Sequence, residues 1–185
     1  IALSRNMFFN GADRYENNAS KSGDKLFTLG SHETENKLRF DMNKFKNGWK
    51  YSYGVDAQYV KYDAAIFNTI KEEMKDSSGN VFSPAITFSS NTAIDFFKFG
   101  AYGQVAKYFF DNKFLVSGGI RADINTYTKN GLNPLRTLSP RVSLSYIINN
   151  QWNISASVGS YYKLPVYTML GYKDNNGTLS NKDLK

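Results

Sequence analysis

The stretch that decides the fold class reads LSPRVSLSYII at residues 138–148, and WNISASVGSYY follows at residues 152–162. Apolar and polar residues alternate along both stretches, and only residues 149–151 separate them. Side chains two residues apart lie on the same face of a β-strand. One face therefore holds Val142, Leu144, Tyr146, Ile148, Trp152, Ile154, Ala156 and Val158, and the other holds Ser139, Arg141, Ser143, Ser145, Asn153, Ser155 and Ser157. The pattern predicts an antiparallel hairpin.

Residues 113–125 repeat this alternation, with Ile120 and Ala122 on one face and Arg121 and Asp123 on the other. A charged face opposite an apolar face with aromatic ends is typical of a strand that has lipid on one side and a water-filled lumen on the other. We therefore predict an all-β chain that forms the wall of an antiparallel transmembrane β-barrel, located in the bacterial outer membrane.

The composition agrees with this interpretation. Hydrophobic residues make up 41% of the chain, and no run approaches the roughly 20 apolar residues that a spanning helix needs. The chain has no cysteine, and His32 is its single histidine. A disulfide framework is thus excluded, and we expect no metal site and no cofactor. The net charge of +7 fits either a basic groove or loops that face an acidic lipid surface.

Alternating connection lengths predict the topology. Tight turns are expected at residues 46–48, 111–112 and 149–151, and long polar connections at residues 10–33, 63–95, 129–136 and from residue 164 onward. Short turns face the periplasm in bacterial barrels and long loops face outward. Residues 69–75 could form a short helix or a β-excursion. We predict a meander of about seven strands that is part of a larger barrel. The predicted strands are residues 1–9, 34–45, 49–62, 96–110, 113–128, 137–148 and 151–163.

The turn residues also predict the register. A type I′ turn at Asn47-Gly48 places Arg39 opposite Asp56 on the lumen side. Tight turns at 111–112 and 149–151 place Arg121 opposite Tyr102 and align the serine rows of residues 143–145 and 155–157. A slip by one residue would move arginines into hydrocarbon, at about 2–4 kcal/mol for each one near the midplane.

Four short motifs occur in a recognisable order: FGAYGQ at 99–104, GGIRAD at 118–123, LSPRVSLSY at 138–146 and GSYYKLPVY at 159–167. They resemble barrel strands of TonB-dependent outer-membrane receptors, particularly those of Bacteroidetes. The resemblance extends from about residue 95 to residue 172, and is only general before that.

This resemblance implies a 22-stranded barrel closed by a plug domain, which imports a ligand such as a siderophore, glycan or peptide and is not an enzyme. The partners it implies are outer-membrane lipid, the protein's own plug domain and TonB, and a surface lipoprotein is a further candidate partner. The chain shows no plug pattern, and its first five residues lack the features of a secretory signal. We therefore expect residues 1–185 to be one partial barrel domain.

Two groups of residues are candidates for ligand contact, and no catalytic constellation is evident. Lumen-facing charges could guide a substrate or contact the plug, although we favour a network of cross-strand pairs within the wall. Aromatic and imidazole side chains in the long connections could stack on a ligand, whereas Tyr162 is assigned to the interfacial girdle. The first group is Arg39, Asp56, Arg121, Asp123 and Arg141, and the second is Tyr15, His32, Phe67 and Tyr172.

Two other classes of function are open. A small closed barrel with an adhesin or structural role would require another strand, for example within residues 81–89. A soluble nucleic-acid binder of the OB type would mix aromatic residues with basic ones on one face. This chain instead places aromatic residues with aliphatic ones, so we expect no nucleic-acid partner.

Overall fold

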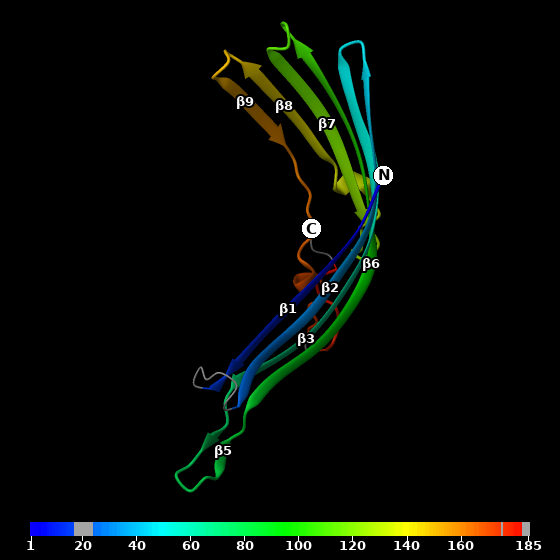
Figure 1. The fold of residues 1–185 in the computed structure, drawn as a ribbon. Helices are drawn as coiled ribbons and strands as arrows, with labels where there is room; N and C mark the ends of the chain where they lie inside the picture. Colours follow the sequence, from blue (N-terminus) through cyan, green and yellow to red (C-terminus); the bar gives the residue numbers. More distant parts are fainter. Residues whose placement is uncertain (17–23, 175, 183–185) are drawn as a thin grey trace.

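The computed structural model describes residues 1–16, 24–174 and 176–182 as a curved antiparallel sheet of seven strands, which is not closed (Figure 1). The strand order is β1-β2-β3-β6-β7-β8-β9, and a two-stranded hairpin, β4-β5, is inserted between β3 and β6. No helix among these residues is long and apolar enough to cross a membrane. The strands are β1 (Ala2–Tyr15), β2 (Lys25–Lys46), β3 (Trp49–Lys71), β4 (Met74–Lys75), β5 (Val81–Ser83), β6 (Ile86–Phe109), β7 (Phe114–Asn125), β8 (Ser139–Ile147) and β9 (Asn153–Gly159).

The predicted register is confirmed at all three tight turns. Asn47 and Gly48 both have positive φ, as a type I′ turn requires, and Arg39 pairs with Asp56. Across the next turn Tyr102 pairs with Arg121, although the turn covers residues 110–113 and so is longer than predicted. Ser145 pairs with Ser155 after the third turn.

Two rings of aromatic residues border the apolar outer face. The Tyr59 and Phe97 rings pack at 5.0 Å at the level that we call the upper aromatic ring, and Trp49, Phe114 and other aromatic residues lie at the other level, near the tight turns. In the view of Figure 1 the tight turns are at the top, so the part of the sheet above the upper aromatic ring is drawn at the bottom. Residues 49–59 span the distance between the two levels, and this length matches the roughly 9–11 residues that a tilted transmembrane strand needs. We assign this part of the sheet to the lipid bilayer.

The long connections predicted at residues 10–33 and 63–95 are largely wrong, because β1, β2, β3 and β6 continue well beyond the upper aromatic ring. Residues 17–23, in the first of these connections, lie outside the described residues. In the second, β4 pairs only with β5, so the β-excursion is correct and the helix is not. The strand needed for a small closed barrel does not join the main sheet: β5 is confined to this hairpin, and residues 86–89 belong to β6.

Above the ring the apolar residues change face. Val60, Tyr62, Ile94 and Phe96 lie on the same side as Asp56, the inner side, and are 0–5% exposed. The C-terminal segment, which we define as residues 160–174 and 176–182, covers them with Tyr167 and Leu170 of helix α1 (Tyr167–Leu170). Figure 1 shows this segment inside the curve of the sheet. The buried core of the described chain is therefore on the lumen side.

Hydrogen bonds fix the C-terminal segment to the wall. Thr92 on β6 donates to the Gly171 carbonyl at 2.8 Å, and Tyr127 donates to the Leu170 carbonyl at 2.6 Å. The Lys173 ammonium donates to the Asn91 carbonyl at 2.7 Å. These contacts involve both wall and loop residues, so the segment is an integral part of the inner surface.

Candidate functional site

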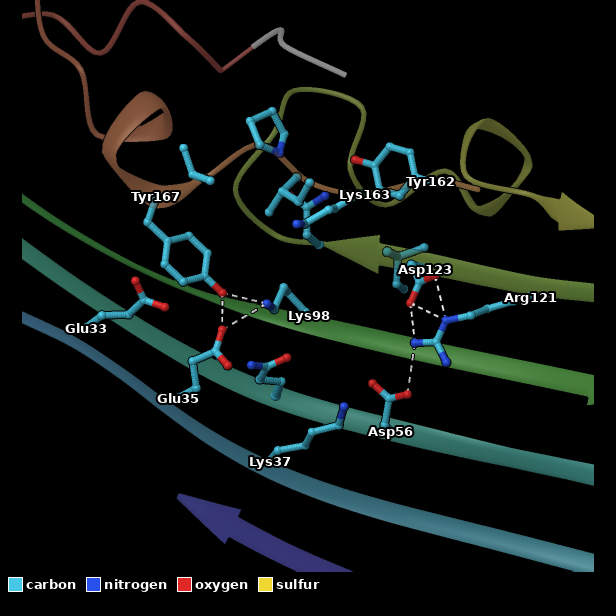
Figure 2. Close-up of a pocket in the computed structure, with 16 residues that line it drawn as sticks. Glu33, Glu35, Lys37, Asp56, Lys98, Arg121, Asp123, Tyr162, Lys163 and Tyr167 are labelled. Carbon is cyan, nitrogen blue, oxygen red and sulfur yellow. Dashed lines mark hydrogen bonds and ion pairs between the residues drawn. The ribbon is translucent and has the colours of Figure 1, made fainter. Parts of the chain in front are cut away.

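A cavity of about 450 Å³, lined by both charged and apolar side chains, lies between the inner wall and the start of the C-terminal segment (Figure 2). Strands β2, β3, β6 and β7 supply its wall side, and residues 162–167 supply the other. The chain leaves β9 after Gly159 as an extended segment, and Pro165 lacks the N–H that a continuing ladder would use. This segment can therefore turn inward across the sheet. The charged lining residues are Glu33, Glu35, Lys37, Asp56, Lys98, Arg121, Asp123 and Lys163.

Arg121 is the centre of one charged cluster in this cavity. Its Nε lies 2.9 Å from Asp123 Oδ2, on the same strand, and its Nη2 lies 3.0 Å from Asp56 Oδ1 on β3. The Asp56 side chain is only 10% exposed. Charge-assisted hydrogen bonds of this kind are about twice as strong as neutral ones. Arg121 thus joins two strands that are not neighbours in the sheet.

Gly100 makes this long reach possible. It lies on β6, between Asp56 and Asp123 in the register. A Cβ atom at this position would overlap the Arg121 guanidinium and would lie 2.9 Å from Asp56 Oδ1. Glycine inside a strand often marks such a close approach.

The wall repeats the arrangement nearby. Tyr102 on β6 donates to Asp41 on β2 at 2.6 Å and lies over Gly54 of β3, where a Cβ would be 2.7 Å from the tyrosine ring. Arg141 on β8 donates to Gln104 on β6 at 3.0 Å. These two contacts also extend across an intervening strand. Long polar side chains therefore connect strands of the inner face that are not neighbours in the sheet.

A second cluster holds the C-terminal segment to the wall. The Tyr167 hydroxyl donates to the Glu35 carboxylate, and the Lys98 ammonium lies 2.6 Å from the Tyr167 oxygen and 3.3 Å from Glu35 Oε1. Burial and then the Glu35 hydrogen bond raise the pKa of Tyr167 well above its usual value. The hydroxyl is therefore neutral and acts as a donor to Glu35 throughout the physiological range.

Three charged groups in the cavity differ from these clusters. Lys37, Lys163 and Glu33 form no salt bridge within the described part of the chain. Figure 2 shows Lys37 on the wall and Lys163 on the C-terminal segment, with Glu33 toward the Tyr167 end. Burial, followed by the nearby Glu35 carboxylate, raises the pKa of Glu33. These three groups can therefore pair with a ligand without breaking a salt bridge, whereas Arg121 and Lys98 already have carboxylate partners in the wall.

The lumen-facing candidates from the sequence all lie on the inner side but do not form one site. Asp56, Arg121 and Asp123 line the cavity, whereas Arg39 forms a salt bridge with Asp41 at 2.6 Å and Arg141 contacts Gln104. Each of the five is therefore engaged with a neighbouring side chain of the wall.

The four residues proposed to contact a ligand from loops do not form one site either. His32 is a residue of β2 that stacks on Phe9 at 4.3 Å, and Phe67 belongs to β3, so their assignment to loops is wrong. Tyr15 ends β1 beneath Lys25, and Tyr172 is 53% exposed after helix α1. None of the four lines the cavity.

Tyr162 also differs from expectation, because it lines the cavity on the lumen side and does not belong to the lipid-facing girdle. Its backbone N–H donates to the Ser139 hydroxyl at 3.2 Å, which turns the chain inward. Sequence reasoning missed Glu33 because this residue falls in the connection predicted at residues 10–33. It missed Glu35 and Lys37, at the start of the strand predicted at residues 34–45, because no local pattern shows that the C-terminal segment lies across them. The one signal that could have indicated the Arg121 contact was Gly100, a glycine inside a strand.

The described residues contain no group of three or more acidic or histidine side chains that could hold a metal ion. What the cavity offers is a set of charged groups, hydroxyls and tyrosine rings around a space large enough for part of a polar ligand. This arrangement suits binding by hydrogen bonds and charge.

Comparison with known proteins places the chain in a family. A family model described as "TonB dependent receptor-like, beta-barrel" matches residues 2–185. No curated protein and no solved structure matches the sequence.

Proposed function

This chain belongs to the TonB-dependent receptor-like β-barrel family, and from that premise we propose that its inner-wall cavity contributes to recognition of an imported polar ligand. The family consists of transporters in the outer membrane of Gram-negative bacteria, and its barrels serve ligand import. Full-length members carry a plug domain and interact with TonB. Residues 1–185 are, in this proposal, one part of such a barrel domain.

The position of the cavity carries the proposal. It lies on the lumen side, close to the level of the upper aromatic ring, on the path of a ligand that crosses the barrel. The C-terminal segment forms its roof through a buried apolar contact, so the cavity is formed before any ligand arrives. A preformed cavity reduces the cost of binding because few side chains must be ordered.

The ligand in this proposal is too large for simple diffusion and belongs to the siderophores, glycans or peptides. Tyr162 and Tyr167 supply aromatic rings at the cavity, and such rings can pack against a sugar or a peptide side chain. Outer-membrane lipid is the partner on the apolar face, and a surface lipoprotein is a further candidate partner of the outer end.

Growth of the source bacterium tests the import function. Strains with and without the gene for the full-length receptor would be compared on media in which a glycan, a peptide mixture or chelated iron is the limiting nutrient. We expect loss of the receptor and loss of TonB to impair growth on the same nutrient. Equal growth of all strains on all three media would contradict the import proposal.

A filled cavity tests the site. Gln58 lines the cavity from β3 and is 8% exposed, so Gln58→Trp would occupy the ligand's space. Lys61 on the same strand points to the outer face, and Lys61→Trp is the matched control. We expect only the first variant to reproduce the growth defect, at equal amounts of receptor in the outer membrane. If neither variant had a growth defect, the cavity would not be needed for import, and its proposed role in ligand recognition would be wrong.

A further inference from the structure

The charges that line the cavity are not equivalent, and their pairing points to a ligand class. Four carboxylates and four basic groups surround it. Arg121 is shared by two carboxylates, Asp56 and Asp123, and Lys98 is paired with Glu35. These ions already have partners in the wall, so a ligand group that competed for them would have to break charge-assisted hydrogen bonds.

The unpaired ions are two ammonium groups and one carboxylate. Lys37 extends from β2, where it is half-buried and pairs in the ladder with Gln58. Lys163 extends from the C-terminal segment on the opposite side of the cavity (Figure 2). Each ammonium carries three donors without a salt-bridge partner in the described chain, and together they supply more positive charge than Glu33 offsets.

We propose that Lys37, on the wall, and Lys163, on the C-terminal segment, bind carboxylate groups of the imported ligand. This inference rests on the proposed import function and names the chemistry of its site. A carboxylate group fits better than a phosphate dianion, which carries twice its charge, because the nearby Arg121 cluster has two carboxylates for one guanidinium and repels additional negative charge. Tyr162 and Tyr167 then flank the uncharged part of the ligand.

A ligand bound in this way would connect two parts of the barrel. Lys37 belongs to β2 and Lys163 follows β9, so the two residues are far apart in the sequence, and both line this cavity. Specificity for a carboxylate therefore depends on the C-terminal segment keeping its inward position.

Matched pairs of probes test the proposal on the purified full-length receptor by titration calorimetry. The pairs are oligogalacturonate and its methyl ester, a tripeptide and its C-terminal amide, and citrate and its trimethyl ester. Within each pair the two members differ mainly in the carboxylate. They also distinguish a sugar acid, a peptide end and a chelator as the source of that group.

We expect at least one carboxylated probe to bind at least tenfold more tightly than its neutral partner. Lys37→Gln and Lys163→Gln should each weaken that binding about tenfold, since a hydrogen bond to a charged group contributes enough for such a change. Lys113→Gln, at an exposed position in the turn after β6, is the control and should leave the affinity unchanged.

Two outcomes would overturn the inference. One is that no carboxylated probe binds better than its neutral partner, and the other is that neither lysine variant weakens binding. In both cases the growth experiment remains decisive for import, because it does not depend on ligand charge. If the receptor took up a neutral ligand, the proposal of a carboxylate ligand would be wrong and the proposed transport function would still hold.

Discussion

Arg121 on β7 reaches Asp56 on β3 at 3.0 Å by passing over Gly100 on the strand between them. A salt bridge on an exposed surface contributes little to stability, but the Asp56 side chain is only 10% exposed. Removing the partner of a buried charge is costly because the charge is left without compensation. The three residues therefore act as a unit that ties the inner wall together.

Gly100→Ala should break this unit. The new methyl group would occupy the space of the guanidinium, and overpacking of this kind costs about 1–3 kcal/mol. Reversible urea unfolding of the full-length receptor from lipid vesicles measures the change in free energy of unfolding. Gly103→Ala is the matched control on the same strand, because a Cβ there meets nothing within 4 Å. Equal effects of the two substitutions would contradict the close approach at Gly100.

Arg121→Lys tests the geometry of the cluster at constant charge. A lysine ammonium lacks the planar fork that serves two carboxylates at once, so one carboxylate loses its partner. We expect a loss of about 1–3 kcal/mol in the free energy of unfolding. Arg141→Lys is the control, because Arg141 has a single contact, to Gln104. A loss that is no larger for Arg121→Lys than for Arg141→Lys would show that the fork is unimportant.

Leu170→Ala should release the C-terminal segment from the wall. Leu170 is fully buried against the inner apolar core, and truncation of a buried leucine costs about 2–5 kcal/mol. Hydrogen exchange of the backbone amides of residues 164–174 in the full-length receptor should become faster. The neighbouring Met169 is 49% exposed, so Met169→Ala should leave exchange unchanged. Slow exchange in both variants would mean that Leu170 does not hold the segment.

Val142→Arg tests which face meets lipid. Val142 is on the apolar face between the aromatic rings and Ser143 is on the lumen face. An arginine that faces lipid costs about 2–4 kcal/mol near the midplane, whereas lumen positions accept charge. Ser143→Arg is therefore the control, and vesicle-based unfolding is the measurement. A larger loss for Ser143→Arg than for Val142→Arg would reverse the assignment of the two faces.

The sequence predicts the membrane-spanning part of this fold well, for a physical reason. Within the bilayer, lipid and lumen impose opposite polarity on neighbouring residues, so the alternation in β7, β8 and β9 is almost complete, with Leu115 and Ile147 beside the turns as exceptions. Asn47 and Gly48 adopt the positive φ that fixes a tight turn, and this turn fixes the pairing of β2 with β3. The faces of Arg121 and Asp123 follow from the same alternation.

The part above the aromatic ring could not be predicted in this way. Both faces of the extended strands can carry polar residues there, so residues 25–33 look like a loop although they pair in a ladder. The apolar side chains of Val60 and Ile94 face inward because the C-terminal segment covers them. That contact joins residues more than 70 positions apart in the sequence. No local pattern encodes it, and the cavity depends on it.

The central claim, that imported ligand binds on the inner wall beneath the C-terminal segment, is tested most directly by the structure of the full-length receptor. The receptor would be determined in outer-membrane lipid together with the nutrient that supports receptor-dependent growth. We predict ligand density in contact with Lys37 and Lys163, with Tyr162 and Tyr167 beside it. Ligand bound elsewhere in the receptor, with this cavity filled by the plug domain or by solvent, would contradict it.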